Sequence, residues 1–153
     1  MDEVRIEIFL KAVSTAELDA DDRLLRSTAL RAAGRAYAPY SKFRVGAAVR
    51  LQDGTIVEGC NQENVACPSG LCAERVALFA AGASYPDTPP VALALAAICA
   101  GEVCETISPC GACRQVMLET ERRYGQNIRI LMCGRNQTLI SPSAKELLPI
   151  AYS

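Results

Sequence analysis

The chain has 153 residues, which is enough for one domain with a buried core and too few for two ordinary domains. Half of the residues are apolar and 22% are charged, a composition that excludes an intrinsically disordered chain. The formal net charge of −1 excludes the strongly basic surface of a non-specific polyanion binder. The apolar run at 91–100 is about half the length of a membrane span, and the start Met1-Asp2-Glu3 lacks the features of a signal peptide, so we expect a soluble cytoplasmic protein.

Cysteine and histidine usage restricts the chemistry further. The chain has eight cysteines and no histidine, which excludes imidazole catalysis and any metal site with a histidine ligand. The cysteine density is below that of disulfide scaffolds, so reduced thiols or a metal site are expected instead.

The first third of the chain predicts strand, helix and hairpin in that order. Residues 4–10 alternate with period two, a modest strand signal. The sequence Ser14-Thr15-Ala16-Glu17 is a capping box that should open a helix ending near Tyr37, before Pro39. Strands at 43–51 and 55–60 flank Asp53-Gly54, a strong hairpin signal. The inner face of the first helix is predicted to carry Leu18, Leu25, Ala29, Ala32 and Ala36.

The remainder predicts alternating helices and strands. Residues 71–81 should form a mostly apolar helix closed by Gly82 and buried between layers or subunits. The continuous apolar run 91–100 is typical of a central strand covered on both faces. A helix at 110–124, a strand at 128–133 and a short helical turn at 145–148 follow, and the inner stripe of the helix is predicted to hold Ala112, Val116 and Thr120. We therefore predict a single α/β domain over residues 1–153 with a three-layer core, in which residues 1–13 form an N-terminal extension.

Three cysteines and one glutamate stand at the starts of two predicted helices. Cys110 and Cys113 are three residues apart on one helix face, a spacing that suits two ligands of one metal ion. Cys72 opens the earlier helix, and free amides at a helix N-terminus favour ionised thiols. Three protein ligands leave one tetrahedral position open, as in a catalytic zinc site, and Glu74 is placed to move the proton of a zinc-activated water.

Two arginines and a fourth cysteine bear on this site. Arg75 and Arg114 each follow a cysteine and could offset the formal charge of −1 on three thiolates with one Zn²⁺. A lone Cys-x-x-Cys is most often a structural half-site or a redox pair, and Cys67 could complete a structural Cys₄ site. The combination of Cys-x-Glu with a later Pro-Cys-x-x-Cys is instead typical of zinc-dependent nucleobase deaminases.

The chain resembles the small homotetrameric cytidine deaminases over roughly residues 16–151. The matching motifs, in order, are Ala38-Pro39-Tyr40-Ser41-Lys42-Phe43 with Val45-Gly46-Ala47-Ala48, Gly59-Cys60-Asn61-Gln62-Glu63-Asn64, Cys72-Ala73-Glu74-Arg75, Ser108-Pro109-Cys110-Gly111-Ala112-Cys113-Arg114-Gln115 and Lys145-Glu146-Leu147-Leu148-Pro149. The resemblance implies a three-layer α/β/α fold with a mixed five-stranded sheet. It also implies the zinc-dependent hydrolysis of cytidine and deoxycytidine to the uridines and ammonia, as part of pyrimidine salvage. The implied partners are a free pyrimidine nucleoside and further copies of the chain, with shared active sites, and neither nucleic acid nor membrane.

The resemblance assigns roles to individual residues. Cys72, Cys110 and Cys113 match the zinc ligands, and Glu74 matches the proton shuttle. Among the other matches, Asn61 and Glu63 correspond to the pair that binds the ribose 3′-hydroxyl, Phe43 to the aromatic ring against the nucleoside, Ala73 to the residue whose backbone amide meets the base, and Arg75 to the arginine that tempers the thiolate charge.

Two positions depart from the family pattern. Cys67 stands where the family usually has tyrosine, and Tyr152 stands near the C-terminus where the family usually has phenylalanine reaching into a neighbouring active site. Three other functions stay open: a structural zinc module, a deaminase of single-stranded nucleic acid, and a deaminase of another aminopyrimidine such as a nucleoside antibiotic.

Overall fold

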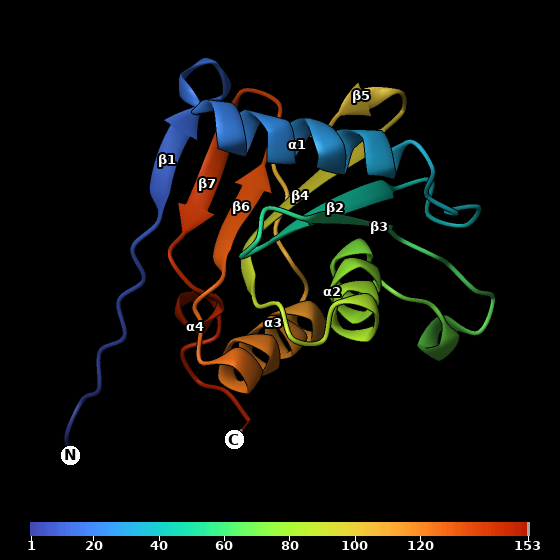
Figure 1. Cartoon of the computed structure of the whole chain (residues 1–153). Helices are drawn as coiled ribbons and strands as arrows, with labels where there is room; N and C mark the ends of the chain where they lie inside the picture. Colours follow the sequence, from blue (N-terminus) through green and yellow to red (C-terminus); the bar gives the residue numbers. More distant parts are fainter. Residues whose placement is uncertain (153) are drawn as a thin grey trace.

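A computed structural model, which describes residues 1–152, shows four α-helices around one sheet (Figure 1). The strands are β1 (Lys11–Ser14), β2 (Arg44–Leu51), β3 (Ile56–Cys60), β4 (Pro90–Cys99), β5 (Glu102–Val103), β6 (Arg129–Cys133) and β7 (Gln137–Ser141). The helices are α1 (Ala20–Ala33), α2 (Ala73–Ser84), α3 (Gly111–Tyr124) and α4 (Ala144–Leu147), with 3₁₀ turns η1 at Thr15–Glu17 and η2 at Cys67–Ser69. None of the described helices combines the length and the apolar character needed to cross a bilayer.

The sheet is mixed, as predicted, but it has seven strands rather than five. The main strand order is β1-β7-β6-β4-β2-β3, and the two-residue β5 pairs with β4. Only the β4–β6 pair is parallel among the paired strands described. The two strands with no predicted counterpart are the short β5 and β7, whose pairing with β4 and β6 depends on tertiary contacts more than on sequence pattern.

Helices cover both faces of the sheet, which confirms the three-layer α/β/α prediction. Leu25 and Ala29 of α1 pack with Ala94 and Ala96 of β4 on one face. On the opposite face, Leu93 and Leu95 pack with residues of α2, α3 and α4. The strand β4 is therefore buried on both faces, as its continuous apolar sequence predicts.

Two glycines allow the helices to lie directly on the strands. A Cβ atom at Gly46 of β2 would lie 1.9 Å from the Ala29 carbonyl oxygen of α1. A Cβ atom at Gly59 of β3 would lie 2.5 Å from the Ala77 amide nitrogen of α2. These close approaches fix the distance of α1 and α2 from the sheet, so the position of the α2 N-terminus depends on Gly59.

The N-terminal boundaries differ from the prediction. Residues 4–10 are not a strand, since the strand lies at Lys11–Ser14 and pairs with β7. The predicted capping box does not form, because Ser14 makes no side-chain hydrogen bond to a backbone amide of the turn. Its hydroxyl donates instead to Glu17 Oε2 at 2.9 Å, and only a 3₁₀ turn follows. The helix α1 begins instead at Ala20, where Asp19 accepts the Asp22 amide at 2.8 Å, and it ends at Ala33, before Tyr37.

Other boundaries also needed correction. Helix α2 continues through Gly82 to Ser84, because Gly82 does not adopt the left-handed conformation of a glycine that closes a helix. The inner face of α3 carries Cys113, Met117 and Glu121, whereas the predicted Ala112 is exposed. The short β7 was not predicted. The hairpin β2–β3 is confirmed, and so is the burial of Leu25, Ala29 and Ala32 on one face of α1. The predicted Leu18 and Ala36 are also buried, but they lie outside this helix.

Candidate metal centre and active site

The helices α2 and α3 begin at the same edge of the sheet. The helix α2 follows β3, and α3 follows β4 after the short β5. The strands β3 and β4 run in the same direction, and both helices begin near their carboxyl ends. In α/β sheets this edge is where ligands commonly bind. Cys72 is the N-cap residue of α2 and Cys110 is the N-cap residue of α3, so the fold brings together two thiols that are 38 residues apart.

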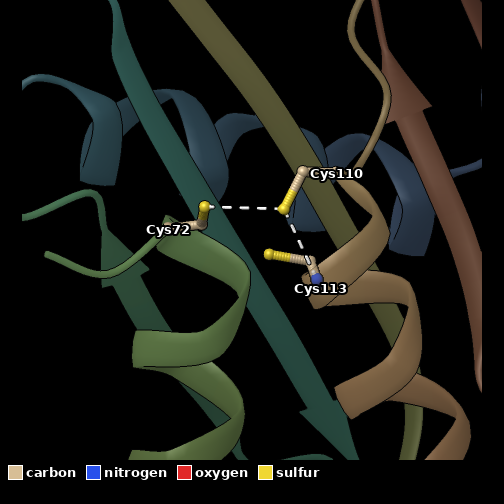
Figure 2. A group of neighbouring side chains, drawn as sticks. All are labelled: Cys72, Cys110 and Cys113. Atoms are coloured by element: carbon tan, nitrogen blue, oxygen red, sulfur yellow. Dashed lines mark hydrogen bonds between the residues drawn. The ribbon is translucent and has the colours of Figure 1, made fainter. Parts of the chain in front are cut away.

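Three sulfur atoms meet at this point (Figure 2). The Sγ atoms of Cys72, Cys110 and Cys113 all lie within 4.8 Å of one another, and the first two are 3.8 Å apart. Two thiolates on tetrahedral zinc, each with a Zn–S bond of about 2.3 Å, have sulfurs about 3.8 Å apart. Among residues 1–152, no second cluster of three or more metal-binding side chains occurs. The trio therefore fits a Zn²⁺ ion, and Cys67 does not belong to it.

The helix ends and Arg75 stabilise negative charge on the sulfurs. The Arg75 guanidinium donates to Cys72 Sγ at 3.5 Å, and the Cys113 amide donates to Cys110 Sγ at 3.4 Å. The neighbouring Cys113 thiol and then Arg75 lower the pKa of Cys72 to about 5. The same interaction with Cys72, together with burial, raises the pKa of Cys113. The metal-free trio thus holds one thiolate readily, and a bound cation would displace the remaining thiol protons.

Glu74 is a buried carboxyl group beside the sulfurs. It lies in the first turn of α2, is 3% exposed and lines the neighbouring cleft. Burial raises its pKa to about 7. A carboxyl group with a pKa near neutrality can both accept and donate a proton, which is the requirement for a proton shuttle.

A cleft of about 640 Å³ opens next to the sulfur trio. This volume lies within the range of roughly 300–1,000 Å³ typical of small-molecule sites. The walls are largely apolar, and the predicted Phe43, Asn61 and Glu63 line the cleft together with Cys72, Glu74 and Cys110. The structure therefore brings three of the predicted substrate contacts, the carboxyl group and two of the three clustered thiols to one cavity.

The Asn61 side chain extends the pairing of β2 beyond the end of β3. Its Oδ1 accepts the Val45 amide at 2.8 Å, and its Nδ2 donates to the Phe43 carbonyl at 2.9 Å. The Asn61 amide therefore fixes the backbone that presents the Phe43 ring. One N–H of the Asn61 Nδ2 group is left over for another acceptor.

The Glu63 carboxylate is held by the loop at residues 40–41. Glu63 Oε2 accepts the amides of Tyr40 at 2.9 Å and Ser41 at 3.3 Å, and Glu63 Oε1 accepts the Ser41 hydroxyl. The Ser41 hydroxyl is the main cause of the lowered pKa of Glu63. Sequence reasoning did not single out Ser41, although it lies in the motif at residues 38–43 that carries the resemblance.

Three other residues singled out from the sequence, Ala73, Cys67 and Tyr152, differ in exposure and in their distance from the cleft. The Ala73 side chain is fully buried under α2 and does not line the cleft. Cys67 is exposed on η2 and lines the cleft wall. Tyr152 is 87% exposed, and its carbonyl accepts hydrogen bonds from Gln115 and Arg122 of α3.

Comparisons with known proteins agree on one family. Residues 19–124 match the family model described as the cytidine and deoxycytidylate deaminase zinc-binding region. A cytidine deaminase of Halalkalibacterium halodurans is 41% identical over 133 residues, which cover 87% of this chain and 95% of that protein. A cytidine deaminase of Sporosarcina psychrophila is 48% identical over 123 residues, covering 80% and 85% of the two chains. The crystal structure of a cytidine deaminase from Burkholderia pseudomallei superposes with a TM-score of 0.71 at 38% identity, covering 85% and 98% of the two chains.

Proposed function

Because the chain belongs to the cytidine and deoxycytidylate deaminase family, we infer that it is a zinc-dependent hydrolase that converts cytidine to uridine and ammonia. The observation that carries this function is the position of Glu74, a buried carboxyl group in the first turn of α2, two residues after Cys72, which is one of three mutually close thiols. A purely structural zinc site has no need of a buried carboxyl group that faces an open cleft.

Cys72, Cys110 and Cys113 are the proposed ligands of the zinc ion. When bound in such a site, zinc lowers the pKa of a water molecule and so supplies a nucleophile at neutral pH. Arg75, which donates to Cys72, tempers the excess negative charge of three thiolates around one divalent ion.

Glu74 is the proposed catalytic acid and base. It accepts the proton that the attacking water loses and donates it to N3 of cytosine, which makes C4 more electrophilic. It then carries the second proton of the former water, now on the C4 hydroxyl, to the amino group at C4; the C4–N bond breaks, the C4 carbonyl forms and ammonia leaves. Its pKa of about 7 supports this role, because the carboxyl group exchanges protons without a large energetic penalty in either direction.

The polar residues of the cleft are the proposed contacts of a free nucleoside. Asn61 and Glu63 are placed to bind the ribose 3′-hydroxyl, and the Phe43 ring packs against the nucleoside. The backbone amide of Ala73 meets the base. Since the 3′-hydroxyl is present in both sugars, we expect deoxycytidine to be a substrate as well as cytidine.

The assembly of the chain and its cellular role are also proposals. We expect the chain to assemble as a homotetramer in which the exposed C-terminal Tyr152 reaches a neighbouring active site. Activity on free nucleosides suits a cytoplasmic enzyme of pyrimidine salvage.

The alternatives fit the cleft less well. A structural Cys₄ site would require Cys67, which lies outside the sulfur trio. A deaminase of single-stranded nucleic acid requires a basic channel, whereas Arg75 is the only lysine or arginine among the described residues that line the cleft. A deaminase of another aminopyrimidine nucleoside remains a second outcome of the substrate test.

The decisive experiment compares Glu74→Gln with Cys110→Ala. We expect Glu74→Gln to retain one equivalent of zinc and to lose about 10²–10⁴-fold in kcat for cytidine, because the amide cannot transfer protons. We expect Cys110→Ala to lose zinc and activity together. Zinc content by atomic emission and ammonia release from cytidine, deoxycytidine and cytidine monophosphate are the measurements. Deamination by Glu74→Gln at the parent rate would rule out the assigned role of this carboxyl group.

A further inference from the structure

The N-terminal residues 1–10 are rich in apolar side chains and belong to no helix or strand of the described chain. They continue from β1 away from the body of the protein (Figure 1). Five large apolar side chains in this segment are 38–89% exposed: Val4, Ile6, Ile8, Phe9 and Leu10. Their period-two pattern predicts a strand, yet none of these residues pairs with a strand of the described chain.

The segment is continuous with an edge strand that is itself open on one side. In the sheet β1 pairs only with β7, so its outer edge presents unpaired N–H and C=O groups. Such an edge is a template for another extended chain. We propose that residues 4–7 pair antiparallel with β1 of a second copy, that residues 8–10 of the two copies lie opposite one another, and that the second copy does the same in return, so that the two sheets join through their β1 edges.

Charges select the register of this pairing. In an antiparallel pair related by a dyad at Phe9, Glu7 lies directly opposite Lys11 of the second copy, and this ion pair occurs twice. The same register places Ile8 opposite Leu10 and brings the two Phe9 rings together, so that apolar residues face apolar residues. A dyad at Glu7 would pair Glu3 with Lys11 but oppose the two Glu7 carboxylates at its centre, and a dyad at Ile8 would oppose Arg5 and Lys11.

A dyad at Ile6 also brings opposite charges together, since it pairs Arg5 with Glu7. That register leaves the outer edge of β1 unpaired and makes an isolated two-stranded ribbon, which is marginally stable in water. The Phe9 register instead extends a sheet that already exists, with pairing over residues 4–14. The open edge of β1 therefore favours the dyad at Phe9.

Disulfide cross-linking tests the register directly. Opposed residues bring their Cα atoms within disulfide range only at the dyad. We expect Phe9→Cys to give a covalent dimer on mild oxidation of the zinc-loaded full chain. Ile6→Cys should give none, because the two substituted positions would be about 20 Å apart along the strands. The unsubstituted chain measures the background from its exposed native thiols, and mass spectrometry identifies the peptide that joins the two introduced thiols.

A charge reversal provides the matched control. In the Phe9→Cys background, we expect Glu7→Lys to slow cross-linking about tenfold, since it opposes Lys11, and Glu7→Lys with Lys11→Glu to restore it. Arg5→Glu changes charge equally but faces Val13, so cross-linking should change less than twofold. Deamination of cytidine should be unchanged in every variant, which shows that each is folded. Cross-linking at Ile6 rather than Phe9, sensitivity to Arg5→Glu, or no cross-linking at all would overturn the proposal.

Discussion

Gly59→Ala should damage the active site without touching any residue that lines it. Gly59 lies in β3 beneath the first turn of α2, and a Cβ atom there would be 2.5 Å from the Ala77 amide nitrogen and 2.6 Å from the Ala73 carbonyl oxygen. Both atoms belong to the backbone of α2, and an ordinary contact requires at least 3.4 Å. The start of α2 must therefore move about 0.9 Å away from the sheet.

This displacement would separate the two halves of the site. The helix α2 carries Cys72 and Glu74, whereas Cys110 and Cys113 belong to α3 and would stay in place. A misplacement of about 1 Å can reduce a rate roughly 10²-fold. Overpacking of this kind also costs about 1–3 kcal/mol of folding free energy. We expect kcat/KM for cytidine to fall about 10²-fold and zinc to be held more weakly.

Gly82, which lies within α2 itself, provides the control. A Cβ atom at Gly82 would meet only the Arg123 guanidinium at 3.1 Å, at the end of a flexible side chain. Gly82→Ala should therefore keep full activity and stabilise the helix by about 0.5–1 kcal/mol. Ammonia release, zinc titration with a chromophoric chelator and thermal unfolding measure all three effects. Parent-like activity and zinc affinity in Gly59→Ala would refute the argument that this close approach positions Cys72 and Glu74.

Two further substitutions test the framework of the site. Glu121 Oε1 accepts the buried amides of Ile128 at 2.8 Å and Ala144 at 2.6 Å, so Glu121→Ala should cost about 2–6 kcal/mol in chemical denaturation, and Glu121→Gln, which keeps the acceptor oxygen, should cost much less. Equal losses in the two variants would contradict this reading of the carboxylate. The hydrogen bond from Ser41 lowers the pKa of Glu63 below its ordinary value of 4.5. The ionised Glu63 therefore stabilises the folded protein fully above pH 4.5, and this stabilisation is lost as the pH falls through the lower pKa of the folded state. Glu63→Gln should accordingly melt below the parent at pH 7, with a difference that shrinks as the pH falls below 4.5, and a difference independent of pH would refute the assignment.

The sequence predicted those elements whose pattern is local. The hairpin at Asp53-Gly54, the buried central strand and the inner face of the first helix all follow from residues adjacent along the chain. The four residues Cys72, Glu74, Cys110 and Cys113 were predicted because helix starts and cysteine spacing carry a chemical meaning even without coordinates.

Elements that depend on distant contacts were not predicted correctly. The strand signal at residues 4–10 is stronger than that at Lys11–Ser14, yet only the latter lies beside β7 and pairs. The inner stripe of α3 is set by which side meets the sheet and α4, and this buries Glu121 through two amides that follow later in the chain. The hold of Ser41 on Glu63 likewise joins two loops that are 22 residues apart.

The division of the sulfur trio between two helices links metal capture to folding. In the unfolded chain Cys110 and Cys113 are close together, but Cys72 is 38 residues away from Cys110. The unfolded chain therefore binds a metal ion weakly. A ligand that prefers the native state adds RT ln(1 + [L]/Kd) to the free energy of unfolding, and at a thousandfold excess over Kd this amounts to about 4 kcal/mol. The melting temperature of this protein should thus report the free zinc concentration around it, and a cell short of the ion would lose the molecule itself as well as its turnover.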